Sequence, residues 1–125
     1  MRPVLRPLSV ALVLACSSFP PASAASYNTP EKAAALFATI DHLKSPGPYT
    51  AIMRELALRC TEGSAAIANA VAGVMQLHKK NTGRSIRAGT VLIDLLTATT
   101  GAKGPQSCID RLISLGILYD HGADK

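Results

Sequence analysis

Prolines and glycines divide this sequence into short apolar segments, and that division constrains the fold more than any other feature. They gather at 46–48, 63, 83 and 101–105. Between these breaks the apolar residues recur three or four positions apart, which is the period of a helix that buries one face. The pattern predicts an all-α protein, built as a compact bundle of four or five short helices.

Four of the predicted helices have clear boundaries. The first begins with Thr29 as N-cap and Pro30 at the first helical position, and it ends before Ser45. The second covers 49–61 with Gly63 as its stop, the third covers 65–80, and the last runs from Pro105 to a helix-ending Gly116. Residues 120–125 are predicted to be a solvated tail. The core-facing residues are expected at Leu36, Phe37, Ile40, Leu43, Ile52, Met53, Leu56, Cys60, Ile67, Ala70, Val71, Val74, Met75, Cys108, Ile109, Leu112, Ile113 and Leu115.

The segment 86–100 supports two interpretations. Its β-branched residues favour a strand by propensity. Its apolar positions Val91, Leu92, Leu95 and Leu96 favour a helix by period. We predict a helix, because a lone strand would have no partner elsewhere in the chain.

The first 24 residues have the three parts of a secretory signal peptide. Arg2 and Arg6 precede an uncharged apolar run, and small residues at Ala22 and Ala24 suit cleavage after Ala24. The predicted mature chain, 25–125, is a single small helical domain that works in the periplasm or outside the cell. The alternative is a lipobox ending at Cys16, where acylation would anchor the protein to a membrane.

Either processing route leaves Cys60 and Cys108 as the two cysteines of the mature chain. In an oxidising compartment such a pair is expected to form a disulfide. A metal site is not predicted, because the chain has no CxxC motif and no histidine pair close to the cysteines.

Positive charge gathers around the turn that follows the third predicted helix, in a chain whose formal net charge is +5. Lys79, Lys80, Arg84 and Arg87 are candidate contacts for an anion or an acidic partner, although a solvated corner that only keeps the chain soluble has the same composition. A second candidate is the loop of Pro46, Gly47, Pro48 and Tyr49, which is predicted to face a partner.

The sequence contains no pattern that indicates catalysis or a cofactor. No G-x-S-x-G motif marks a nucleophile, and the glycines around Arg84 lack the spacing and the lysine of a phosphate loop. His42, His78 and His121 each have a structural explanation at a helix end or in the tail. The three tyrosines and two phenylalanines give little for nucleic-acid bases to stack on, so nucleic-acid binding is not expected.

These features indicate an exported binding protein without catalytic activity, whose partner is a protein. In size, export and cysteine content the chain resembles periplasmic immunity proteins that inhibit toxins, which would imply an inhibitory role. Two alternatives are an envelope-tethered structural module and a periplasmic stress chaperone. The small residues of 65–80 also allow close approach of a second helix, either inside the bundle or in a homodimer.

Overall fold

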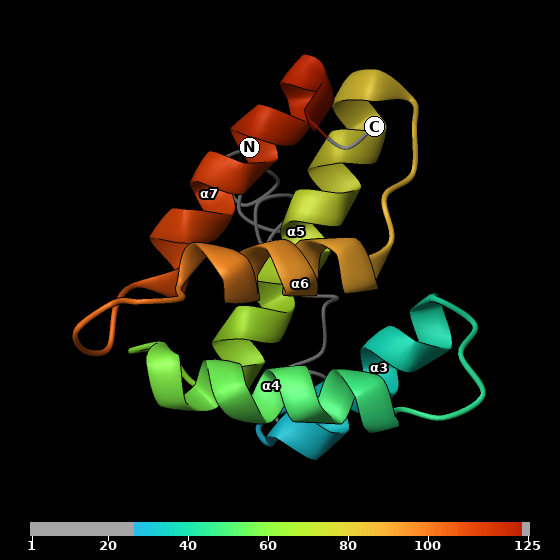
Figure 1. Ribbon diagram of the computed structural model, residues 1–125. Coiled ribbons are helices and arrows are strands. Elements are labelled where there is room, and N and C mark those ends of the chain that lie inside the picture. Colours follow the sequence, from blue (N-terminus) through green and yellow to red (C-terminus); the bar gives the residue numbers. More distant parts are fainter. Residues whose placement is uncertain (1–26, 124–125) are drawn as a thin grey trace, which may run out of the picture.

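The computed structural model describes residues 27–123, in which five α-helices pack together as predicted (Figure 1). The predicted signal peptide and Cys16 lie outside these residues. Within 27–123, no helix is long and apolar enough to cross a bilayer. The helices are α3 (Pro30–Ile40), α4 (Gly47–Arg59), α5 (Ser64–Thr82), α6 (Ala88–Ala98) and α7 (Cys108–Leu118), and a π-helical turn, η1 (Tyr119–Ala123), follows α7.

The longest helix, α5, contacts both halves of the bundle. In Figure 1, α7 runs alongside α5 in the same direction, α6 lies across them, and α3 and α4 form a pair around the beginning of α5. The core lies where these helices meet, and its largest fully buried side chains are Tyr119, Phe37, Met53, Leu56, Ile67, Leu92, Leu95 and Leu112. Among the alanines of α5, Ala68 is buried in this core.

The segment 86–100 forms helix α6 over Ala88–Ala98, as its period predicted. Val91, Leu92 and Leu95 of α6 are fully buried, so the strand interpretation was wrong. The predicted start of α3 is also confirmed, because the Thr29 hydroxyl accepts a hydrogen bond from the Lys32 N–H at 3.2 Å and Pro30 opens the helix. Gly83 ends α5 in the left-handed conformation, with φ 77°, which favours glycine because it has no Cβ.

Several predicted helix ends were wrong. Helix α3 ends at Ile40 instead of just before Ser45, and α4 begins at Gly47 instead of Tyr49. Helix α4 stops at Arg59, and Gly63 instead precedes the first residue of α5. Helix α7 starts at Cys108 with Ser107 as its N-cap, three residues after Pro105. It also continues through Gly116, which lies beside Val74 of α5. The left-handed glycine at this end of the chain is Gly122, inside η1.

Two residues of the predicted core face outward. Ile40 at the end of α3 and Ile113 in α7 are exposed, while Ala33 and Ala34 of α3 are fully buried in places where no large residue was expected. Alanines fill these positions because α3 lies close against α4.

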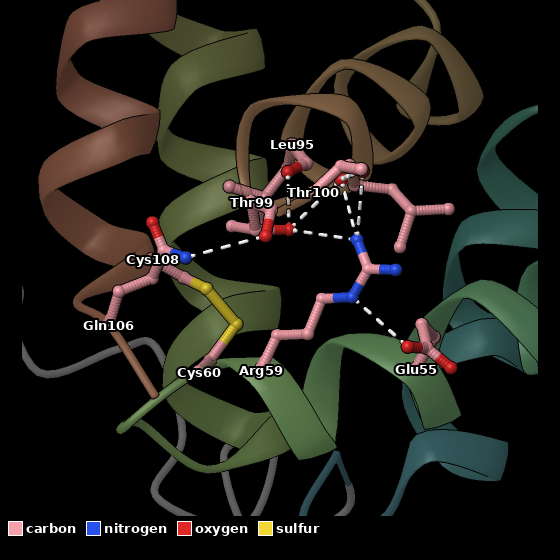
Figure 2. Close-up of polar contacts among 9 residues, drawn as sticks. Glu55, Arg59, Cys60, Leu95, Thr99, Thr100, Gln106 and Cys108 are labelled. Atoms are coloured by element: carbon pink, nitrogen blue, oxygen red, sulfur yellow. Dashed lines mark hydrogen bonds and ion pairs between the residues drawn. A yellow bond between two sulfur atoms is a disulfide. The ribbon is translucent and has the colours of Figure 1, made fainter. Parts of the chain in front are cut away.

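The predicted pair Cys60 and Cys108 lies at disulfide-bonding distance, with Cα atoms 5.3 Å apart. Both residues are buried, and the bridge joins the end of α4 to the start of α7 (Figure 2). Two backbone hydrogen bonds reinforce the bridge. The Thr61 N–H donates to the Gln106 carbonyl, and the Gln106 N–H donates to the Arg59 carbonyl, both at 2.9 Å.

Candidate functional site

A hollow of about 660 Å³ is lined by basic residues from three separate segments of the chain. His42 comes from the end of α3, Lys79 from the last turn of α5, and Arg87 from the connection to α6. The hollow, called the basic hollow below, is lined by Ile40, Asp41, His42, Met75, Gln76, Lys79, Ser85, Ile86 and Arg87.

The backbone at His42 directs the chain around the rim of this hollow. Its φ is 60°, the only positive φ of a non-glycine residue within 27–123. Such a conformation is uncommon for a residue with a Cβ and costs free energy. It is held because the Leu43 N–H donates to the Ala38 carbonyl at 2.8 Å, which closes the end of α3.

The carboxylate of Asp41, the acidic residue in the hollow, is already hydrogen-bonded within the protein. One carboxylate oxygen accepts the Ala88 N–H at 3.0 Å, and the other accepts the Gly89 N–H at 2.8 Å and the Tyr49 hydroxyl. The Asp41 side chain is 3% exposed, and the Arg87 guanidinium lies 3.8 Å from it. Asp41 thus supplies the N-terminal cap that α6 lacks from its own sequence.

The wall of the hollow presents net positive charge around an apolar patch. Asp41 is buried beneath backbone donors, whereas Lys79, Arg87 and His42 are exposed. Ile40 is also exposed and Met75 is half-buried. A surface of this kind combines electrostatic attraction for an acidic group with apolar area to be covered.

The structure brings only part of the predicted basic cluster together. Lys79 and Arg87 line the hollow, but Lys80 and Arg84 do not. Lys80 is exposed and Arg84 is half-buried. His42 was missed as a member, because it lies 37 positions before Lys79 and no local pattern connects the two.

The predicted partner-facing loop is only partly on the surface. Pro46, Gly47 and Pro48 are exposed at the start of α4, but Tyr49 is 6% exposed and its hydroxyl bonds Asp41. Tyr49 is therefore not available to a partner. Burial raises the pKa of the Tyr49 phenol above its ordinary value, and the hydrogen bond to the Asp41 carboxylate raises it further.

His78 and Asp120 correct the prediction of a solvated tail. His78 is 1% exposed, and its Nδ1 lies 3.1 Å from a carboxylate oxygen of Asp120. Asn81 donates to the other oxygen at 2.8 Å. These hydrogen bonds from Asn81 and His78 hold the pKa of Asp120 below its ordinary value. The His78–Asp120 pair fastens η1 to α5. The apolar pattern of α5 does not predict this pair, because its two residues are 42 positions apart.

Cys60, Cys108 and Glu62 are the three residues within 27–123 whose ligand atoms lie close enough to hold one metal ion. The geometry fits a structural role better, because the sulfurs lie at bonding distance and a metal needs free thiolates. Glu62 accepts the Ser107 hydroxyl at 2.8 Å and the Cys108 N–H at 2.9 Å, which caps α7.

The basic hollow also contains a serine, a histidine and an aspartate, which raises the question of a catalytic relay. Within 27–123, no hydrogen bond joins His42 to Asp41 or to Ser85, since both Asp41 oxygens face the start of α6. A nucleophilic triad requires these contacts in sequence. The arrangement is that of a helix cap beside a positively charged surface.

No protein-family model matches this chain, and neither a curated protein nor a solved structure does.

Proposed function

We propose that this is a small exported binding protein without catalytic activity, which uses the basic hollow to hold an acidic surface of a protein partner, as an inhibitor or immunity protein would. The observation that carries the proposal is the convergence of His42, Lys79 and Arg87 around exposed apolar area. The one carboxylate among the lining residues, Asp41, is buried, and it is hydrogen-bonded to backbone N–H groups of α6 and lies 3.8 Å from the Arg87 guanidinium.

The charge of the hollow also favours a protein over a small ligand. The basic side chains of His42, Lys79 and Arg87 come from segments that surround a wide hollow, so they are spread over a surface instead of converging on one point. Rim charges of this type accelerate association and select acidic partners, and their effect declines with salt.

A pull-down from the envelope and secreted fractions of the source cells tests the proposal. The bait is the mature chain, compared with a double charge reversal of the hollow, Lys79→Glu with Arg87→Glu. A matched control reverses two exposed lysines outside it, Lys32→Glu with Lys103→Glu. We expect wild type and control to retain the same stoichiometric partner and the hollow variant to lose it.

Equal recovery by all three baits would place the interface elsewhere. For the recovered partner, titration calorimetry at increasing salt is expected to show the same loss of affinity for wild type and for the control variant.

The proposed location has its own test. Mass spectrometry of the natural protein is expected to give a chain that begins at Ala25, the product of cleavage after Ala24. A lipid adduct on Cys16 would establish the anchored alternative, and an intact Met1 would contradict export.

A further inference from the structure

The connection 101–104 between α6 and α7 has the sequence Gly-Ala-Lys-Gly, and it projects from the side of the bundle (Figure 1). All four of its residues are exposed. Together with Leu58 and Arg59 of α4 they line a hollow of about 300 Å³, so part of the loop stands away from α4. Within 27–123, no residue of 101–105 takes part in a hydrogen bond or an ion pair. The loop can therefore change its conformation without breaking a polar contact.

Lys103 gives this loop the side chain that a trypsin-like endopeptidase recognises. Such an enzyme binds a basic side chain next to the bond that it cleaves, through a carboxylate in its specificity pocket. It also needs a substrate segment that is exposed and adaptable, so cleavage concentrates in exposed loops of small residues. Ala102 and Gly104 on either side of Lys103 meet that requirement.

Three other lysines or arginines within 27–123 lie outside the helices, namely Lys44, Arg84 and Arg87, and each is next to a hydrogen-bonded backbone group. Arg84 donates its own backbone N–H to the Thr82 hydroxyl at 3.1 Å. The residue after Arg87 donates to the Asp41 carboxylate, and the residue before Lys44 donates to a carbonyl of α3. Cleavage is therefore expected first at Lys103.

We propose that an endopeptidase of this class cleaves the chain between Lys103 and Gly104, and that the product stays folded as two chains joined by the disulfide. Water adds across the peptide bond, which leaves a carboxylate on Lys103 and an amino group on Gly104. The second chain, 104–125, contains α7 and η1. The bridge from Cys60 to Cys108 attaches it to the first chain close behind the cut.

Contacts on both sides of the loop hold the cut ends in place. On the side of α6, the Arg59 guanidinium donates to the Leu96 carbonyl at 2.8 Å. On the side of α7, Gln106 exchanges backbone hydrogen bonds with the end of α4. The Tyr119 hydroxyl in η1 donates to the Asp94 carboxylate of α6 at 2.7 Å. None of these contacts involves 101–105, so cleavage leaves them intact.

Separation of α7 from the bundle therefore requires two chemically different events. Cleavage alone leaves the bridge, and reduction alone leaves the peptide chain. A dithiol reductant donates two electrons and two protons to the bridge and becomes a disulfide itself. After both events only noncovalent contacts hold 104–125. The two-chain form thus persists in an oxidising compartment, whereas a reducing compartment releases α7.

Limited digestion with trypsin tests the cleavage site. Wild type and variants are produced from the whole sequence and purified without reductant. We expect the first product to be heavier than the intact protein by one water molecule, to run as one species without reductant, and to keep its helical circular dichroism. Mass spectrometry after reduction is expected to show a second chain that begins at Gly104.

Two serine variants identify the bond. Lys103→Ser is expected to slow the first cleavage by roughly tenfold, because the protease must then wait for a hydrogen-bonded segment to open. Lys44→Ser changes another exposed lysine outside the helices and is expected to be cleaved as fast as wild type. A first cut after Lys44 or Arg84, or an unchanged rate for Lys103→Ser, would overturn the proposal.

Size-exclusion chromatography of the cleaved protein tests the need for both events. Cleaved wild type is expected to elute as one species without reductant and to release 104–125 when dithiothreitol is added. Release of 104–125 without reductant would contradict the role of the bridge, and so would digestion to small fragments with no stable two-chain product. A second chain that stays bound after reduction would contradict the proposed release.

Discussion

Gly73 and Gly89 are single glycines inside helices, and their surroundings give them opposite roles. A Cβ added at Gly89 would collide with the hydroxyl of Tyr49, which sits over the first turn of α6 to reach Asp41. A Cβ added at Gly73 would point into open space. Packing against Tyr49 therefore requires a glycine at position 89. At position 73 a glycine only makes α5 less stable than an alanine would.

Gly89→Ala is expected to lower the free energy of unfolding by about 1–3 kcal/mol, because the new methyl group displaces the buried Tyr49 ring. Gly73→Ala is expected to raise it by about 0.5–1 kcal/mol through helix propensity. Urea denaturation of dilute samples measures both. Equal stability of Gly89→Ala and wild type would show that Tyr49 is not docked on α6.

Helix ends in this protein are fastened by side chains from other elements. Asp41 caps the start of α6, Glu62 caps the start of α7, and the Arg59 guanidinium donates to the Leu96 carbonyl at 2.8 Å at the end of α6. Figure 2 shows the Arg59 contacts, which include Thr99 and Thr100 and lie next to the Cys60–Cys108 bridge. Each cap orients two helices at once, so these residues determine geometry as well as stability.

Glu62 makes the α7 cap sensitive to acid. Burial opposes ionisation of Glu62, but hydrogen bonds from Ser107 and from backbone N–H groups of α7 outweigh it, and its pKa lies below the ordinary value of 4.5. A carboxyl with a lowered folded pKa stabilises the fold above its ordinary pKa, and that stability is lost as the pH falls through the folded pKa. Thermal unfolding at about pH 7 and about pH 3 is expected to show a larger loss for wild type than for Glu62→Gln. An identical loss would contradict this role for Glu62.

Arg59→Met keeps the aliphatic stem and removes the guanidinium that caps α6. We expect a loss of about 1–2 kcal/mol, because partly buried carbonyl and hydroxyl acceptors lose a charged donor. Arg54→Met is the matched control on the same helix, since Arg54 pairs with Glu31 on the exposed surface, where ion pairs contribute little. Chemical denaturation should separate the two variants, and similar losses would show that Arg59 acts only as a surface charge.

At the scale of the whole molecule, the Cys60–Cys108 bridge is a long-range covalent link between the two halves of the bundle. Cys60 and Cys108 are separated by 48 positions, and their bridge connects the end of α4 to the start of α7. The Thr61–Gln106 pairing and the Glu62 cap lie beside it, so a covalent bond, a backbone contact and a helix cap reinforce the same junction. Loss of the bridge should therefore loosen α7 and η1 from the rest.

Cys60→Ser combined with Cys108→Ser is expected to lower the free energy of unfolding by about 4 kcal/mol on the chain-entropy model. Reductant should lower the melting temperature of wild type towards that of the double variant and leave the variant unchanged. Wild type that melts at the same temperature with and without reductant would show that the two thiols are free.

Much of the architecture follows from local pattern. The apolar period, the Thr29–Pro30 start of α3 and the Gly83 end of α5 predicted the helices, because such signals act within one or two turns of chain. The cysteine pair could also be predicted, since the predicted mature chain has two cysteines and these allow a single pairing. Ile40 and Ile113 belong to the apolar faces that the period predicted, but both are exposed. The period predicts which face of a helix is apolar, but it does not predict how far a neighbouring helix covers that face.

The sequence alone determined that the chain would be helical, where most helices begin, and which two cysteines would meet. Only the tertiary structure decided that Asp41 caps α6, that His78 is buried against Asp120, and that His42 joins Lys79 and Arg87. The residues at the end of α3 or in α5 and the distant residues that they meet here are from 37 to 48 positions apart. Local helix propensity does not predict contacts between residues so far apart in the sequence. Such contacts form when separate apolar faces are buried together and the polar groups at their edges must find hydrogen-bond partners.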